Sequence, residues 1–180
     1  FCYLEMPELA RLQERFGDTV AIRWRAFDLR PDPVPTLDPN GEYLHRVWGE
    51  AVYPMASARG MVLRLPPVQP RSRLAHETAA FARDRGRFDA VHEALFRAFF
   101  QDGRDLAEAS VLGDVAASTG LDPDALGAAL RGEVDHVEGV RVGGDIETDE
   151  AGEQGQGGGR TNEATGRPEE ATGGRWTRGT

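Results

Sequence analysis

Apolar residues recur at helical spacing through the first sixteen positions of the chain. They are Met6, Leu9, Leu12 and Phe16, and they follow one another at steps of three or four residues. This spacing predicts an amphipathic helix, and Gly17 is a natural stop for it. Pro7 lies inside the predicted helix, where it removes one backbone hydrogen bond. We therefore expect a helix that is bent near its start.

The segment that follows alternates between apolar and polar residues with period two. The apolar positions are Val20, Ile22 and Trp24. Alternation of this kind is typical of a half-buried strand, and it predicts a strand over residues 20–25 with these three side chains facing the core. Phe27 and Leu29 continue the strand with a change of phase.

A proline-rich loop over residues 31–39 leads from the strand to a long predicted helix. Asp38 followed by Pro39 is a typical helix start, and Gly60 is the expected end. The apolar stripe of this helix comprises Leu44, Val47, Trp48, Ala51, Val52 and Met55. We expect Trp48 and Met55 to pack in a core rather than to line a substrate groove.

Four further helices are predicted between Ser72 and Gly132. Ser72 and Asp122 are the expected N-caps of the first and the last of them. Glycines at the expected ends of these four helices are Gly86, Gly103, Gly120 and Gly132. Such a succession of short helices, after one helix and one strand, differs from the alternation of strands and helices in repeated βαβ units. It predicts a helical subdomain attached to a smaller α/β part.

The composition changes after Gly132. Beyond Ile146 there is no Val, Ile, Leu, Met, Phe or Tyr, and Trp176 is the only large apolar residue. A stretch of this kind cannot bury enough surface to offset the entropy lost on ordering. It predicts either a natural disordered tail or a coding sequence whose frame has shifted near residues 140–150.

The length of the chain indicates the number of domains, and its charge excludes some kinds of partner. The 180 residues suit one domain with an inserted subdomain. A net charge of −9 with no basic run argues against nucleic acid and anionic membrane as partners. No segment is long and apolar enough to span a bilayer. The four histidines show no metal-ligand spacing, and one cysteine cannot form an internal disulfide or a cysteine metal cage.

Cys2 is the only cysteine, and it lies in the first turn of the first predicted helix. The backbone N–H groups there have no partner within the helix, and together with the helix dipole they favour a thiolate. Redox and nucleophilic cysteines are placed in such positions. A lone cysteine can equally be a small buried apolar residue, and the local pattern leaves both interpretations open.

The opening segment, residues 1–7, is similar to the end of the Cys-Pro-Phe-Cys-Tyr-Leu segment of the DsbA-like thiol–disulfide oxidoreductases, in particular their FrnE-like intracellular branch. Further segments resemble that branch in the same order along the chain. They are residues 22–31, 72–82, 93–100 and 103–105, Ala116, and residues 120–122. The resemblance covers residues 1–132.

This resemblance implies an α/β fold: a thioredoxin-like domain with an inserted helical subdomain, and a sheet that is incomplete in this chain. Residues 1–37 would be a partial thioredoxin-like part and residues 38–132 the inserted subdomain. Residues 133–148 would return to the thioredoxin-like part, and residues 149–180 would be a disordered low-complexity tail.

The resemblance also implies a function. Cys2 would be the second, resolving cysteine of a C-x-x-C site, and the first cysteine would be missing from a chain truncated at its N-terminus. His76 would lie near this site. The expected enzyme is a cytoplasmic protein disulfide oxidoreductase that acts on a protein or small-molecule thiol or disulfide. It would use no bound cofactor or metal, with glutathione as an optional co-substrate.

Two alternatives remain open at this point. One is a glutathione-dependent transferase or isomerase on the same fold, and the other is a non-catalytic fragment. The residue at the first-cysteine position would distinguish the enzymes, because serine there favours glutathione chemistry and cysteine favours disulfide exchange.

Overall fold

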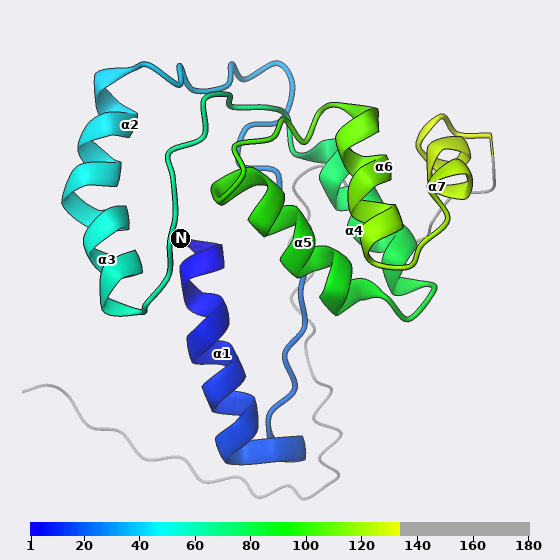
Figure 1. Ribbon diagram of the computed structural model, residues 1–180, viewed down its shortest axis with the longest axis horizontal. Helices are drawn as coiled ribbons and strands as arrows, with labels where there is room; N and C mark the ends of the chain where they lie inside the picture. The colour runs from blue at the N-terminus through cyan, green and yellow to red at the C-terminus, as the bar shows by residue number, and fades with distance from the viewer. Residues whose placement is uncertain (134–180) are drawn as a thin grey trace, which may run out of the picture. The chain divides into compact units, whose positions relative to one another are not determined.

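Helices make up the regular structure of residues 1–133, the part of the chain that the computed structural model describes (Figure 1). The α-helices are α1 (Cys2–Phe16), α2 (Glu42–Val47), α3 (Tyr53–Ala58), α4 (Arg73–Arg83), α5 (Phe88–Phe100), α6 (Ala109–Ser118) and α7 (Pro123–Leu130). Two short elements of other types are the 3₁₀-helix η1 (Gly17–Thr19) and the π-helix η2 (Trp48–Val52). The predicted tail, and all but the first residue of the predicted return segment, lie outside the described residues.

The first predicted helix is confirmed as α1. It ends before Gly17, whose φ of 52° is a conformation that glycine adopts without steric cost. Its apolar stripe is only partly covered. Tyr3 and Leu4 are buried, whereas Leu12 and Phe16 are 38% and 44% exposed. The described residues therefore hold α1 mainly by its first turn.

The predicted strand over residues 20–25 is not formed, and no other strand occurs within residues 1–133. The backbone is extended at Val20, and burial alternates along residues 20–30, with the even-numbered positions partly covered. The predicted change of phase is wrong, because Phe27 and Leu29 are 72% and 83% exposed. A strand needs a partner for its backbone N–H and C=O groups. Residues 21–30 make no backbone–backbone hydrogen bond with other described residues.

The second predicted helix begins later than expected. Asp38 does not cap it, because its carboxylate accepts a hydrogen bond from the backbone N–H of Asn40 at 2.9 Å. The carbonyl of Asp38 accepts one from Gly41 at 3.0 Å. These bonds close a turn, and α2 starts only at Glu42.

The helix that follows is continuous from α2 through η2 to α3 (Figure 1). Its buried residues are Leu44, Trp48, Val52 and Ala56, each four positions after the last. With Tyr3, Leu4 and Leu63 they form one cluster of buried side chains, here called the α1 core. The core packing predicted for Trp48 is confirmed.

A second cluster, here called the bundle core, joins α4, α5, α6 and α7. Its buried members are Ala75, Phe81, Ala82, Val91, Leu95, Ala98, Leu112, Val115, Ala116, Leu121 and Leu126. Helix α5 contributes to both clusters, because Leu95 belongs to the bundle core while Phe96 and Phe100 pack against the α1 core. The two clusters are therefore connected through one helix.

Ser72 precedes α4 but does not cap it. Its backbone is helical, and its side chain makes no capping hydrogen bond. The hydroxyl instead donates to the carboxylate of Asp28 at 3.2 Å. The expected cap is thus replaced by a contact with the extended segment that follows α1.

Asp122 caps α7 as predicted. Its carboxylate accepts hydrogen bonds from the backbone N–H groups of Asp124, at 2.9 Å, and Ala125, at 3.3 Å. We expect Asp122→Ala to lower the free energy of unfolding by about 1 kcal/mol. Asp122→Asn should keep most of the stability that the cap contributes, because an amide oxygen can accept the same hydrogen bonds. Urea unfolding would measure both, and equal losses from the two substitutions would contradict the capping role.

Candidate functional site

Cys2 lies at the first position of α1, and its free thiol is exposed. Phe1 precedes it as the N-cap residue and is 60% exposed. The side chain of Phe1 cannot accept a hydrogen bond from the first turn. The N–H groups of that turn therefore remain available to stabilise negative charge beside the thiol. The exposure of Cys2 excludes the interpretation of this residue as a small buried apolar side chain.

Tyr3 fixes the first turn of α1 against the end of α5. Its hydroxyl accepts a hydrogen bond from the side-chain amide of Gln101 at 2.9 Å. Its ring stacks on Phe96, with centroids 5.0 Å apart, and on Phe100 at 5.8 Å. Burial raises the pKa of the Tyr3 hydroxyl above its ordinary value, so the group is a neutral phenol at physiological pH.

Arg59, at the end of α3, holds the same turn from another direction. Its guanidinium is 3.0 Å from the carboxylate of Glu5 and 3.9 Å from that of Glu8. The Arg59 side chain is 20% exposed, whereas Glu5 is 49% exposed. Ion pairs open to water add little stability. We therefore assign Arg59 the role of fixing the position of α1 rather than of stabilising the fold.

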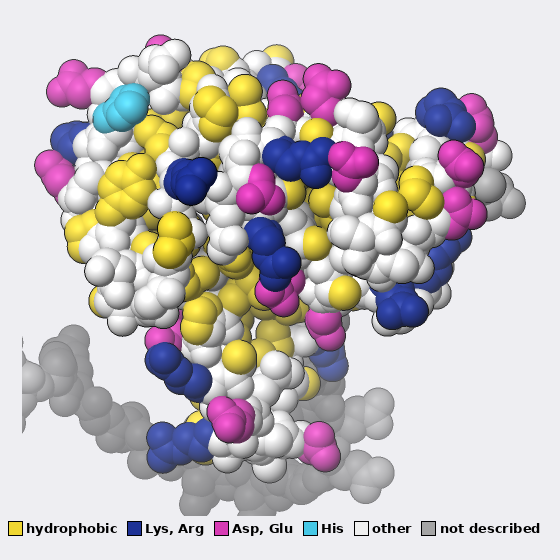
Figure 2. All heavy atoms as spheres, viewed as in Figure 1, with side chains coloured by type: hydrophobic (Ala, Val, Ile, Leu, Met, Phe, Trp, Pro, Cys, Tyr) yellow, Lys and Arg dark blue, Asp and Glu magenta, His cyan; other side chains and the backbone are white. Residues whose placement is uncertain are grey.

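Apolar side chains surround the inner side of the first turn of α1. On the face drawn in Figure 2, hydrophobic side chains lie between α1 and the helices above it, while charged side chains gather toward the other end of α1. Leu4, which is fully buried, joins this region to Trp48 and Leu63 of the α1 core. The exposed thiol thus projects from a turn that is held firmly on its inner side.

His92 lies among aromatic rings rather than in solvent. Its ring packs against Trp24 at 4.4 Å, Phe96 at 4.8 Å and Phe88 at 5.0 Å between centroids. Burial lowers the pKa of His92 below its usual value of 6.5. Phe88 and Phe96 belong to α5 itself, whereas Trp24 comes from the extended segment and is distant in sequence.

His76 was expected near the cysteine site. The structure places it beside Phe27 and Asp28 and close enough to His92 for the two rings to interact electrostatically. Burial lowers the pKa of His76, and Phe27 and Asp28 partly oppose this. Its Nε2 atom is fully buried without a hydrogen-bond partner among the described residues. None of the contacts found for it involves Cys2.

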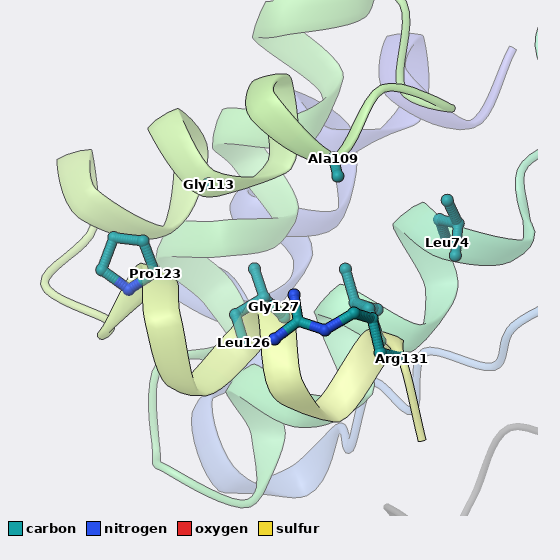
Figure 3. Close-up of a pocket in the computed structure, with 8 residues that line it drawn as sticks. Leu74, Ala109, Gly113, Pro123, Leu126, Gly127 and Arg131 are labelled. Atoms are coloured by element: carbon teal, nitrogen blue, oxygen red, sulfur yellow. The ribbon is translucent and has the colours of Figure 1, made fainter. Parts of the chain in front are cut away.

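A cavity of about 250 Å³ lies between α4, α6 and α7 (Figure 3). Its walls are formed by Leu74, Ala109, Gly113, Pro123, Leu126, Gly127, Leu130 and Arg131. Arg131 folds back toward Gly127 and is paired with Glu133 at 2.8 Å. No residue of α1 lines the cavity, so it is separate from the candidate site at Cys2.

The comparison with known families decides the class of this chain. Residues 1–139 match the family described as the DSBA-like thioredoxin domain. The chain belongs to this family. Because the match begins at residue 1, it includes α1 and Cys2. The resemblance inferred from the sequence is therefore confirmed at the level of the DsbA-like family.

Two relatives of this DsbA-like chain carry further information. The uncharacterized protein YwbO of Bacillus subtilis is 32% identical over 117 residues, which are 63% of this chain and 58% of YwbO. The crystal structure of a probable DsbA oxidoreductase from Streptomyces coelicolor matches with a TM-score of 0.57 and 22% identity. That match covers 72% of this chain and 62% of the other. The DsbA-like chain thus spans about three fifths of each relative and shares the fold of the second.

Within residues 1–133, no group of three or more His, Cys, Asp or Glu side chains is arranged to hold a metal ion. No helix found there is long and apolar enough to cross a membrane.

Proposed function

We propose that this chain is a thiol–disulfide oxidoreductase of the FrnE-like branch, in which Cys2 is the resolving cysteine of a C-x-x-C site. The observation that supports this best is the exposed Cys2 thiol at the start of α1, within the region that matches the DsbA-like family. The contacts of Tyr3 and Arg59 support it further, because they hold the turn that must present the thiol.

The proposed reaction is a two-step exchange between a dithiol and a disulfide. The attacking cysteine, three positions before Cys2, would attack one sulfur of a substrate disulfide as a thiolate and form a mixed disulfide. The other substrate sulfur would leave as a thiolate. Cys2 would then attack the sulfur of the attacking cysteine, close the enzyme disulfide and release the second substrate thiolate. Two electrons pass from enzyme to substrate, and the reverse sequence oxidises a dithiol.

The proposed substrates are protein or small-molecule thiols and disulfides, and glutathione fits as the small thiol that returns the enzyme to its starting state. We propose a cytoplasmic site of action, as for the resembled branch. We also propose that a sheet completes the thioredoxin fold. Its support is the extended backbone and alternating burial of residues 20–30.

The decisive test adds Cys-Pro directly before Phe1. We expect the extended chain to reduce a fluorescent peptide disulfide catalytically with glutathione as the reductant. The same extension with Cys2→Ser should stop at a mixed disulfide that mass spectrometry detects. A Ser-Pro extension is the matched control, and it should not turn over.

Two results would count against the proposal. Turnover by the chain without any extension would show that Cys2 acts without a partner cysteine and is not a resolving residue. A Cys-Pro extension that has the same thermal unfolding curve as the parent but no turnover would show that this fold does not carry the exchange. Conjugation of glutathione by the Ser-Pro extension would favour the transferase alternative.

A further inference from the structure

Three exposed arginines lie at the turn that joins α4 to α5. Arg83 is the last residue of α4, and Arg85 and Arg87 follow it in the turn. None of the three forms an ion pair with a described carboxylate. At the other end of α4, by contrast, Arg73 is paired with Glu77 at 2.7 Å. The turn therefore carries positive charge that the described part of the chain does not neutralise.

Neutral groups hold the first two guanidiniums in place. That of Arg83 donates a hydrogen bond to the carbonyl of Trp24 at 3.2 Å and lies over the ring of Phe88, 4.5 Å from its centroid. That of Arg85 donates to the carbonyl of Phe81 at 3.1 Å and lies over the ring of the same residue, 3.4 Å from its centroid. A carbonyl or a ring orients a guanidinium without cancelling its charge.

The third guanidinium, that of Arg87, lies beside Gly120 in the connection between α6 and α7. Its central carbon is 3.8 Å from the point that a Cβ on Gly120 would occupy. The three guanidiniums thus rest on different elements and keep N–H donors free for another partner. Because their side chains are already oriented, binding an anion costs them little further conformational freedom.

The surroundings of this turn are positive although the whole chain is negative. Arg23 and Arg25 flank Trp24 in the extended segment, and both are exposed. Residues 22–25 and 83–89 together hold five arginines and two aspartates, a net charge of +3, in a chain whose net charge is −9. We call the five residues the arginine surface: Arg23, Arg25, Arg83, Arg85 and Arg87. Cations spread over several elements fit an extended row of anionic groups better than one small anion.

We propose that the arginine surface binds an acidic segment of a partner protein, an extended polypeptide rich in aspartate and glutamate. The planar fork of a guanidinium matches a carboxylate through two parallel hydrogen bonds. Asp84 and Asp89 lie among the arginines, and they disfavour a nucleic acid, which carries a phosphate at every nucleotide. The rings of Phe81 and Phe88 are covered by arginines and are not free to stack on bases. This surface does not depend on the proposed role of Cys2.

The test uses the full chain and a fluorescein-labelled peptide of alternating glutamate and serine, with binding measured by fluorescence anisotropy. We expect saturable binding that weakens as salt is added, because the charges are exposed. The triple variant Arg83→Gln, Arg85→Gln, Arg87→Gln should weaken binding about tenfold, since it removes three exposed charge pairs of modest strength.

The matched control is the triple variant Arg15→Gln, Arg46→Gln, Arg64→Gln. It changes the net charge by the same amount at exposed arginines on other parts of the chain, none of which forms an ion pair with a described carboxylate. We expect it to change the affinity by less than about twofold, because distant exposed charges are screened by salt.

Three results would overturn the proposal. The first is the absence of saturable peptide binding at physiological salt, and the second is an equal loss of affinity in the two triple variants. The third is tighter binding of single-stranded DNA with the same number of charges as the peptide, which would identify a nucleic-acid surface. If thermal unfolding shows that the first triple variant does not fold, Arg83→Gln, Arg87→Gln replaces it. That variant leaves Arg85 on the ring of Phe81 in the bundle core, and Arg15 is restored in the control to keep the charges matched.

Discussion

Leu4→Ala is expected to lower the free energy of unfolding by about 3 kcal/mol. Leu4 is fully buried, and with Tyr3 it supplies the inward side chains of the first turn of α1. Truncation removes apolar contacts and leaves a cavity where α1 meets the α1 core. Because the rest of α1 is only partly covered by described residues, this substitution should also loosen the helix that carries Cys2.

Leu12→Ala is the control for this experiment. Leu12 lies on the same helix and loses the same atoms, but it is 38% exposed. We expect it to cost less than about 1 kcal/mol. Urea unfolding gives both values, and the rate of Cys2 alkylation by a maleimide in native buffer reports the loosening of α1. Equal losses of stability in the two variants would contradict the assignment of Leu4 as the main anchor.

Phe81→Ala is expected to cost about 4 kcal/mol. Phe81 is 2% exposed at the centre of the bundle core, and the guanidinium of Arg85 lies over its ring, 3.4 Å from the centroid. The substitution removes both the buried ring and this cation–π contact. Since α5 links the two cores, the loss should appear in a single unfolding transition of the described residues.

Phe27→Ala is the control that tests whether burial causes the loss of stability expected for Phe81→Ala. It removes the same side chain from a position that is 72% exposed. We expect a change within about 0.5 kcal/mol. Thermal unfolding followed by circular dichroism would compare the two variants. A large loss in Phe27→Ala would mean that this residue packs against a surface outside the described residues.

Local patterns predicted the helices because the forces that define a helix end are local. Gly17 follows α1, and Asp122 with Pro123 opens α7, as expected from the sequence. Each of these residues acts on the backbone beside it, through a permitted φ or a capping carboxylate. Positions of this kind can be identified from a few neighbouring residues.

Predictions failed where a side chain had a distant partner. Ser72 is of a residue type that is favoured at helix N-caps, but its hydroxyl donates a hydrogen bond to Asp28 instead. Phe88 and Phe96 lie four positions from His92 on α5 and contact its ring, but the third ring of its surroundings, that of Trp24, comes from the extended segment. The strand predicted over residues 20–25 failed for a related reason. The alternation correctly predicted which side chains are partly covered, but a strand also needs a partner strand, and a local pattern does not show whether one is present.

The candidate site was predictable in part. The position of Cys2 at a helix start followed from the spacing of the apolar residues, and the structure confirms it. The contacts that fix this turn could not be predicted. Gln101 is 98 residues from Tyr3, and Arg59 is 54 residues from Glu5. No local pattern marks either residue as a partner.

The π-helical turn η2 has a consequence for the alignment of this chain with its relatives. In an α-helix, positions four apart drift by about 40° at each step. Leu44, Trp48, Val52 and Ala56 would therefore spread over about 120°, yet all four are buried. The wider turn at Trp48–Val52 accommodates one additional residue and brings them back toward one line. A relative that is α-helical throughout should align here only with a one-residue gap, and an alignment without that gap would pair its buried positions with exposed ones.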